Sequence, residues 1–527
     1  MQLFNENPEF DYVIIGGGTA GCVLANRLSS DPNISVLVIE EGPTDQNLES
    51  VLQLKNWLSL LNGPLDYAYP TTEQPRGNSH IIHSRAKVLG GCSSHNTLIS
   101  FFPFPEDLDD WSKAGARGWE WENFKKYASR VKCHIQPVAP KDRNSLAGAF
   151  IESTQKAFGI PQIGNFAEWV TSGGTSPWQE GVGWLSVAYE PETGKRSSAS
   201  VAYLHEILGK RKTLKIWFET WVTKLVVSQS QITASGVEVL TKNGKRIFVR
   251  AKREVCICAG AIDSPRLLLL SGIGPKKQLE KLGIPVVLDL PGVGENLLDH
   301  PETIIMWRTG PHPKETVMKS DAAYFTKRIG STDRRPDMMS HMYQVPFADN
   351  TERLGYPRPD HAFCITPNVP RPKSKGRLYL TSSNPKVKPA LDFKYFTDPE
   401  DYDAKCLVDG IKQARQIAKQ EPLKSWLLEE VAPGPNVQTD SELNEYSRKV
   451  SHTVYHPAGT CKMGDENDEL AVVNPKLQVR GLLNVRIADA SIFPTMVTPN
   501  PMITVLMIGE KASEMILEDY YTKLSKL

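Results

Sequence analysis

The sequence predicts an α/β protein with a parallel sheet that binds a dinucleotide, and two local patterns indicate this fold. Residues 11–15 form a run of aromatic and β-branched side chains, which is typical of a strand buried on both faces of a parallel sheet. Glycines follow that run at a recognisable spacing. Residues 214–257 indicate a meander of strands, with a turn at Asn243 and Gly244, that returns the chain to the same domain.

The glycines after the first strand carry the clearest signal. Gly16, Gly18 and Gly21 have GxGxxG spacing, and they precede a predicted helix over residues 22–29 and a predicted strand over 35–39. Such glycines let the backbone approach a pyrophosphate, which then sits at the helix N-terminus. Glu40 ends the second strand, near the spacing of about 20 residues expected for a carboxylate that binds ribose. The order of these features predicts a dinucleotide site.

Residues 85–97 predict a loop whose backbone approaches a ligand closely. The segment contains Gly90, Gly91, His95 and Asn96, and glycine, serine and asparagine are unfavourable within helices and strands. An ordinary turn is the alternative interpretation of this loop.

The dinucleotide is expected to be flavin adenine dinucleotide (FAD). A nicotinamide enzyme would continue with further βα units, whereas here a region punctuated by Trp57, Pro64, Pro70 and Pro75 follows. The meander then leads into residues 258–261 and a predicted helix over 264–270. This interrupted return to the nucleotide domain suits FAD.

Composition excludes several other classes of function. The 527 residues include 61 basic and 60 acidic side chains, so the chain has no charge excess typical of nucleic-acid binding. The apolar runs are too short to cross a membrane. The eight cysteines form no CxxC pair, so we expect no metal site and reduced thiols in an intracellular protein.

Longer motifs resemble the glucose–methanol–choline (GMC) family of flavoenzymes, and within it the members that oxidise choline with oxygen. The resemblance covers nearly the whole chain and rests on FDYVIIGGGTAGCVLANRLS, RAKVLGGCSSHNT, AGAIDSPRLLLLSGIGP, PGVGENLLDHPE, VYHPAGT and ADASIFPTMVTPNPMITVLMIGE. It implies a Rossmann-like FAD-binding domain from residues 1–155, 197–303 and 453–527. It also implies an α+β substrate-binding domain with an antiparallel sheet from residues 156–196 and 304–452.

Oxidising an alcohol requires several polar groups around one oxygen. An alcohol with a pKa near 15.7 lies roughly nine pKa units above histidine, equivalent to about 12 kcal/mol, so a single base is insufficient. His456 and Asn500, each held by neighbouring prolines, are candidates. The resemblance implies that His456, Asn500 and His341 face the substrate hydroxyl. Whether His456 is a base or an imidazolium that stabilises the alkoxide stays open at this point.

The resemblance also implies a site for a quaternary ammonium group. Such a cation has no proton to donate, so it needs a carboxylate and aromatic faces. Glu302 matches the carboxylate, and Trp57, Phe347, Tyr455 and Val454 match the pocket walls. Two departures affect this site. We count Thr97 among the candidate catalytic residues, and it stands where bacterial family members have a serine. In residues 316–323 those family members have a tryptophan, which this sequence lacks.

Cofactor contacts are implied for residues in both glycine-rich segments and near the C-terminus. These are Gly16, Gly18, Gly21, Glu40, Gly90, Gly91, His95, Asn96, Asp489 and Pro501. The resemblance implies that a ring nitrogen of His95 is bonded covalently to FAD, which makes His95 a tether and not a base.

The implied reaction converts choline to betaine aldehyde and on to glycine betaine, while O2 is reduced to H2O2. The alternatives are a choline dehydrogenase, another alcohol oxidase of the family, and a lyase with a structural flavin. We expect a homodimer or larger homo-oligomer that contacts neither nucleic acid nor membrane. The tripeptide Ser525-Lys526-Leu527 predicts recognition by the peroxisomal import receptor, and hence a eukaryotic, fungal-type enzyme in the peroxisome.

Overall fold

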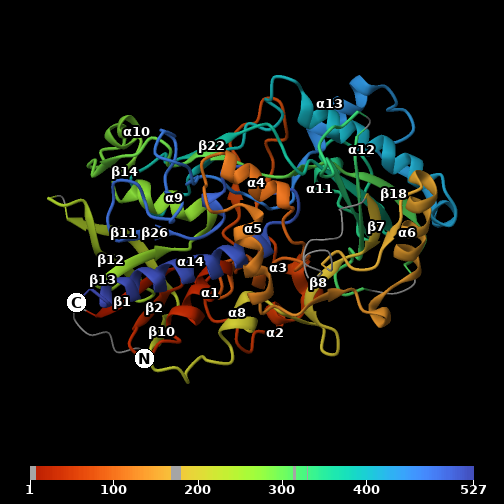
Figure 1. Ribbon diagram of the computed structural model, residues 1–527. Helices are drawn as coiled ribbons and strands as arrows, with labels where there is room; N and C mark the ends of the chain where they lie inside the picture. The colour runs from red at the N-terminus through yellow and green to blue at the C-terminus, as the bar shows by residue number, and fades with distance from the viewer. Residues whose placement is uncertain (1–7, 168–179, 229, 313–315, 329, 527) are drawn as a thin grey trace.

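A mixed sheet forms the first part of the molecule (Figure 1). The computed structural model describes residues 8–167, 180–228, 230–312, 316–328 and 330–526. In these residues, seven strands form this sheet, in which β10, β2, β1, β13 and β26 are parallel and β11 and β12 extend it as an antiparallel pair. The strands are β1 (Glu9–Ile15), β2 (Val36–Ile39), β10 (Leu214–Trp217), β11 (Thr220–Ser228), β12 (Thr233–Thr241), β13 (Arg246–Ile257) and β26 (Val485–Ile487).

The predicted start of the sheet agrees with the structure, and one part of the predicted meander does not. The helix expected from residue 22 is α1 (Thr19–Leu28), which begins directly after Gly18. β10 is not part of the antiparallel meander, because its residues pair in parallel with β2, from Leu214 beside Val36 to Trp217 beside Ile39. Proximity in sequence does not specify which strand a segment pairs with. The antiparallel meander therefore begins at β11 and not at β10.

Two helices cover one face of this sheet. In Figure 1 the long helix α14 (Met502–Leu524) crosses the strands beside α1, and the two helices pack together. Their close approach requires a glycine, because a Cβ atom at Gly509 would lie 2.8 Å from the Cβ of Val23. This packing places the beginnings of α1 and α14, which are far apart in sequence, at one cavity.

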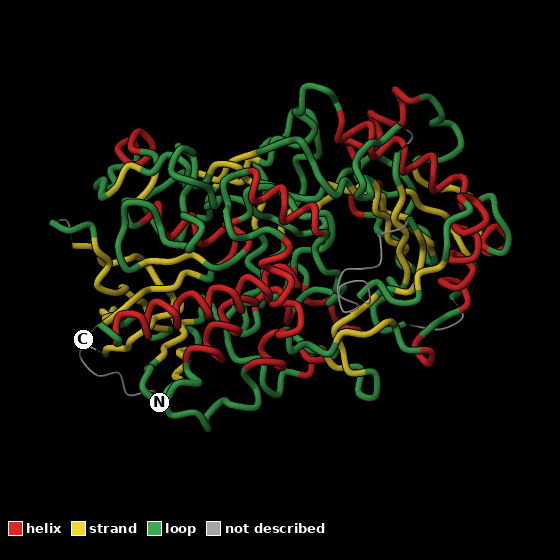
Figure 2. Tube along the Cα trace, viewed as in Figure 1, coloured by secondary structure: helices red, strands yellow, loops and turns green. Residues whose placement is uncertain are grey.

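A second, mainly antiparallel sheet forms the other part, and Figure 2 shows its strands as a separate yellow group beneath helices. Helices α6 (Ser145–Phe158) and α12 (Tyr402–Ala418) pack on it, and α13 (Asp440–Val450) packs on α12. Its described strands are β6 (Gln162–Ile163), β7 (Gly181–Trp184), β17 (Pro301–Glu302), β18 (Ile305–Thr309), β19 (Ala322–Thr326), β20 (Met338–Tyr343), β21 (Ala362–Asn368), β24 (Leu427–Ala432) and β25 (His452–Thr453).

The remaining elements are short, apart from α4 and α9. The helices are α2 (Glu49–Leu52), α3 (Trp57–Leu60), α4 (Pro105–Lys113), α5 (Trp121–Phe124), α8 (Ala199–Tyr203), α9 (Gly260–Leu270), α10 (Lys276–Lys281) and α11 (Asp349–Glu352), with 3-10 turns η1 (Leu54–Asn56), η2 (Gly91–Ser94), η3 (Lys125–Arg130), η4 (Pro140–Asp142), η5 (Leu423–Trp426) and η6 (Ala490–Ile492). The small strands are β3 (Tyr69–Pro70), β4 (Ile82–His83), β5 (Ile135–Pro137), β8 (Ser186–Glu190), β9 (Lys195–Arg196), β14 (Ile273–Gly274), β15 (Leu288–Asp289), β16 (Glu295–Leu297), β22 (Gly376–Tyr379) and β23 (Ala390–Asp392).

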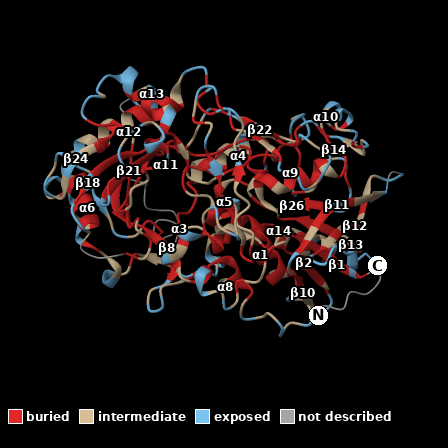
Figure 3. Cartoon of the chain, turned by 180° about the vertical axis from the view of Figure 1, so that it is seen from behind, coloured by how far each residue is buried: buried red, intermediate tan, exposed pale blue. Residues whose placement is uncertain are grey.

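The core runs through both sheets, as the red strands of Figure 3 show. All strands of the first sheet come from the segments predicted for FAD binding, whereas the predicted boundary at residue 155 falls inside α6, which packs on the second sheet. The assignment of segments to domains stays a prediction.

Some expectations are not tested by the fold. No helix among the described residues is long and apolar enough to span a membrane, and no group of three metal-ligating side chains occurs among them. Ser525 and Lys526 are exposed after α14, whereas Leu527 lies outside the described residues. The import signal and the oligomeric state therefore stay predictions.

Candidate active site

One cavity of about 810 Å³ brings the two parts together, within the range of roughly 300–1,000 Å³ typical of ligand sites. We call the lining from the glycine-rich segments, Glu40 and Asp489 the dinucleotide side. The lining around Glu302, His341 and His456 is the substrate side. The predicted residues that line the cavity are Gly16, Gly18, Glu40, Trp57, Gly91, His95, Asn96, Thr97, Glu302, His341, Phe347, Val454, Tyr455, His456, Asp489, Asn500 and Pro501.

Gly21 and Gly90 do not line the cavity, and they shape its wall instead. A Cβ atom at Gly21 would lie 2.0 Å from the carbonyl oxygen of Gly16, so only glycine lets α1 start this close to β1. Gly90 has a positive φ of 88°, and its N–H donates to the carbonyl of Gly17 at 2.7 Å. A backbone hydrogen bond thereby joins the two glycine-rich segments.

The dinucleotide side suits FAD on two structural observations. A Cβ atom at Gly91 would lie 2.7 Å from the Cα of Gly18, so two backbones meet without side chains at the start of α1. Gly18 is the N-cap of α1 and supplies no side-chain acceptor, which leaves the first amides of the helix for a pyrophosphate. The residues present therefore fit the cofactor.

Two buried carboxylates complete this side. Glu40 accepts hydrogen bonds from the N–H groups of Gly17 at 2.9 Å and Gly42 at 2.8 Å, and burial raises its pKa to about 7. Asp489 accepts from the N–H of Gly260 at 2.9 Å and the hydroxyl of Ser264 at 2.6 Å. Burial also raises the pKa of Asp489. Each carboxylate holds backbone in place and lines the cavity.

His95 follows η2 and is buried at the cavity wall. Its Nε2 donates to the carbonyl of Leu60 at 2.9 Å, and its Nδ1 lies 3.5 Å from the hydroxyl of Ser84. Burial lowers the pKa of His95 to about 4, so the ring is neutral at neutral pH. Asn96 uses its Oδ1 to accept from the N–H of Leu98.

His456 is oriented by a second histidine, His300, which the sequence reasoning missed. Nε2 of His300 lies 2.8 Å from the carbonyl of Pro370 and 3.0 Å from that of Val497, so this nitrogen carries the proton. Burial lowers the pKa of His300 to about 4, which keeps it neutral. Its Nδ1 therefore accepts from Nδ1 of His456 at 2.8 Å.

This arrangement decides which nitrogen of His456 can act as a base. With its Nδ1 as the donor, neutral His456 has an unprotonated Nε2, whose lone pair accepts from Nδ2 of Asn500 at 3.5 Å. Burial lowers the pKa of His456 well below its usual range, and the backbone N–H of His456 is held by Asp299 at 3.0 Å. His456 therefore presents a neutral, unprotonated nitrogen beside an amide.

Unpartnered polar atoms gather on the substrate side. Neither ring nitrogen of His341 has a hydrogen-bond partner in the described residues, and burial lowers its pKa to about 4. Oε2 of Glu302 likewise has no partner there, and burial raises the pKa of Glu302 to about 8. A buried polar atom without a partner costs about 1–3 kcal/mol, so these atoms indicate a place for a polar or charged ligand.

Aromatic rings line the same cavity as this carboxylate. Trp57 is fixed by its Nε1 donating to the carbonyl of Met318 at 2.8 Å, and its ring centroid lies 6.5 Å from that of Phe347. Tyr343, which the sequence reasoning missed, packs edge-to-face on Phe347 at 4.5 Å. Tyr455 adopts a positive φ of 63°, two residues after the end of β25. The 316–323 segment lacks tryptophan, and it contributes the carbonyl of Met318 that holds Trp57.

Three residues escaped the sequence reasoning, His300, Tyr343 and His452, and the sequence holds signals for the first two. His300 stands two positions before Glu302 in the DHPE motif, and Tyr343 stands two positions after His341 on the same face of β20. His452 pairs with Glu302 across β17 and β25, and its Nδ1 lies 4.0 Å from Oε1 of Glu302.

Comparison with known proteins finds matches over most of the chain. Two family profiles described as GMC oxidoreductase match residues 10–302 and 372–509. A choline oxidase from Arthrobacter globiformis is 40% identical over 96% of this chain and 94% of its own length. The mitochondrial choline dehydrogenase of Homo sapiens is 34% identical over 96% of this chain and 90% of its own length.

The fold is also shared with solved structures. The crystal structure of pyridoxine 4-oxidase from Mesorbium loti superposes with a TM-score of 0.86 at 25% identity, covering 96% of this chain and 98% of the other. Formate oxidase superposes with a TM-score of 0.86 at 24% identity over 98% of this chain and 100% of its own, which shows a likeness of fold alone.

Proposed function

We propose that this chain, which belongs to the GMC oxidoreductase family and so is a flavin oxidoreductase acting on an alcohol, is a choline oxidase. The observation that carries the proposal is Glu302, a buried carboxylate with an unpartnered oxygen, in a cavity that aromatic rings, His456 and Asn500 also line. A carboxylate so placed is suited to a cation that offers no proton. The quaternary ammonium of choline is such a cation.

Glu302 and the rings have separate tasks in binding choline. Each cation–π contact with Trp57, Tyr343, Phe347 or Tyr455 contributes about 0.5–2 kcal/mol. Pairing with a buried carboxylate contributes more, because removing one partner of a buried ion pair costs about 3–5 kcal/mol. A bound cation favours the charged form of Glu302 and so opposes the burial that raises its pKa.

At the other end of choline, His456 and Asn500 act on the hydroxyl. The lone pair of His456 Nε2 accepts the hydroxyl proton, and Nδ2 of Asn500 donates to the oxygen as negative charge develops. Either unpartnered nitrogen of His341 is available to donate to the same oxygen. FAD, when bound, accepts the hydride from the alcohol carbon and passes the electrons to O2, which yields H2O2.

The same groups serve a second oxidation. Hydrated betaine aldehyde carries hydroxyls on the carbon that loses hydride, so His456 and Asn500 face an equivalent oxygen. The product is glycine betaine. Thr97 lines this cavity where bacterial relatives have serine, and it retains a hydroxyl.

We further propose that His95 is bonded covalently to FAD. The support is its place at the cavity wall after the glycine-rich loop and its neutral, buried ring. The test is acid precipitation: yellow colour that stays with the protein is expected, and colour that moves to the supernatant contradicts the tether. His95→Ala is expected to release the flavin.

The proposed function is tested by adding choline to the purified yellow protein without oxygen. We expect the oxidised flavin band to bleach, and to return in air with formation of H2O2. A choline dehydrogenase, favoured by the 34% identity to the human enzyme, would bleach with choline but form little H2O2 in air. Bleaching with other alcohols and not with choline would contradict the choice of substrate. A flavin that no alcohol bleaches would favour a lyase.

A further inference from the structure

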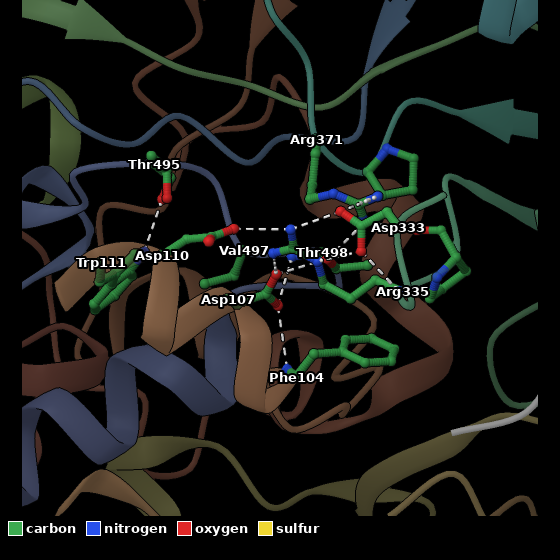
Figure 4. A network of polar contacts seen from close by, with 12 residues as sticks. Phe104, Asp107, Asp110, Trp111, Asp333, Arg335, Arg371, Thr495, Val497 and Thr498 are labelled. Atoms are coloured by element: carbon green, nitrogen blue, oxygen red, sulfur yellow. Dashed lines mark hydrogen bonds and ion pairs between the residues drawn. The ribbon is translucent and has the colours of Figure 1, made fainter. Parts of the chain in front are cut away.

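A cluster of charged side chains with a buried centre joins α4 to the segment around Thr498 (Figure 4). At its centre Asp107, on α4, has no exposed surface. One oxygen accepts from the N–H groups of Thr498 at 2.9 Å and Phe104 at 3.1 Å. The other accepts from the hydroxyl of Thr498 at 2.7 Å and from Arg335 at 2.9 Å. Asp107 therefore holds both the N–H and the hydroxyl of Thr498.

Two arginines from elsewhere in the chain complete the cluster. Arg335 also pairs with Asp110 and with Asp333, each at 2.8 Å. Arg371 donates to the hydroxyl of Thr498 at 3.0 Å, and its guanidinium lies 3.5 Å from Asp333. The cluster thus ties α4 to three segments that are distant in sequence.

Both acceptors of His300 are adjacent to residues of this cluster. Val497, whose carbonyl accepts from Nε2 of His300, directly precedes Thr498. Pro370, whose carbonyl accepts from the same nitrogen, directly precedes Arg371. Farther along the chain, Trp111 of α4 donates to the carbonyl of Thr495 at 3.0 Å, so α4 anchors the segment before Asn500 twice.

We propose that Asp107, Arg371 and Thr498 are positioning residues, which place the carbonyls of Val497 and Pro370 so that His300 keeps its Nε2–H tautomer and His456 keeps a free Nε2. The inference rests on the proposed function, because it concerns the proton acceptor of the same reaction. None of the three positioning residues lines the cavity. Each acts through the backbone and through His300.

The consequence of loosening the cluster follows from the chemistry of imidazole. If the two carbonyls move away, His300 can place its proton on Nδ1, and that nitrogen then no longer accepts from His456. Protonated His456 also loses the acceptor that stabilises its charge. The tautomer of His456 with an unprotonated Nε2 becomes less populated, and that nitrogen becomes a weaker base. The cavity walls stay in place.

The test is Thr498→Val in the holoenzyme, which removes the hydroxyl and keeps the shape. We expect kcat to fall on the order of 10- to 100-fold, with KM little changed, since small displacements of catalytic groups have effects of this size. The acid limb of the pH profile of kcat/KM should move to lower pH, because the pKa of His456 falls. Thr498→Ser should restore both values.

A matched control separates positioning from general damage. Arg415 and Glu430 form another largely buried ion pair, between α12 and β24, at 2.7 Å and each 14% exposed. Glu430→Gln should leave kcat and the pH profile unchanged. Equal losses in Thr498→Val and Glu430→Gln, or an unchanged pH profile in Thr498→Val, would overturn the proposal.

A second variant decides the matter if Thr498→Val does not fold. Arg371→Lys keeps the positive charge but loses the fork that reaches both Thr498 and Asp333. We expect the same shift of the acid limb, and its absence contradicts the proposal. All profiles are measured with whichever alcohol bleaches the wild-type flavin. A substrate other than choline would thus refute the proposed function and leave this inference standing.

Discussion

The buried carboxylates on the two sides of the cavity differ in their hydrogen-bond partners. On the dinucleotide side, both oxygens of Glu40 accept backbone N–H groups. On the substrate side, Oε2 of Glu302 has no partner in the described residues, although the side chain is just as buried. Burial raises the pKa of both, to about 7 for Glu40 and about 8 for Glu302.

The difference indicates that Glu40 supports the fold, whereas Glu302 is available to bind a ligand. Satisfying Glu40 within the chain stabilises the turns at Gly17 and Gly42 before any ligand binds. Leaving Oε2 of Glu302 without a partner costs folding free energy, and a cation that enters recovers it. The contrast predicts that changes on the substrate side alter turnover and affinity, and that changes on the dinucleotide side alter cofactor retention.

The largest effect is expected for His456→Ala. Loss of a general base lowers kcat by about 10²- to 10⁴-fold, and the flavin content should stay unchanged. Rapid-reaction measurement of anaerobic flavin bleaching checks this. His134→Ala, which removes an exposed histidine paired with Glu190, is the control and should keep its rate. A rate for His456→Ala near that of the control would remove His456 from the mechanism.

Glu302→Gln should come next, and its effect should depend on the charge of the substrate. Loss of the carboxylate is expected to raise the KM for choline on the order of 100-fold, which corresponds to about 3 kcal/mol of lost ion pairing. An uncharged isostere, 3,3-dimethyl-1-butanol, should show little change. Equal increases for both alcohols would show that Glu302 does not bind the headgroup.

The pH dependence of choline binding sharpens the comparison. Because the pKa of Glu302 is raised to about 8, the carboxyl is neutral below that pH and gains its charge as pH rises through it. The affinity for choline should therefore fall by up to about tenfold for each pH unit below 8. Burial lowers the pKa of His452, which lies 4.0 Å away, and so favours the neutral ring beside Glu302. Binding of the uncharged isostere should be flat between pH 6 and 9.

The smallest effect on turnover is expected for Glu40→Gln. The amide offers only one acceptor to two backbone N–H groups, so about 1–3 kcal/mol of stability is lost at the dinucleotide side. The thermal unfolding temperature should fall, while the KM for choline in fully loaded enzyme stays the same. A changed KM would mean that the two sides of the cavity are not separate.

Sequence reasoning located the features that depend on local geometry. The strand, the glycines and Glu40 are close along the chain, and each has a steric or hydrogen-bonding requirement that few residue types meet. His456, Asn500 and Glu302 were recognisable only through resemblance to a family, since a single histidine or glutamate carries no signal of its own. The position of β10 was predicted wrongly, because spacing along the chain does not choose a strand edge.

By itself, then, the sequence determined the fold class and the dinucleotide turn, and its resemblance to a family pointed to residues that line the cavity. The tertiary structure alone decided which nitrogen of His456 is free, because that depends on His300 and on carbonyls from Pro370 and Val497. These partners lie on separate segments, and hydrogen bonds between them exist only after both sheets have packed together.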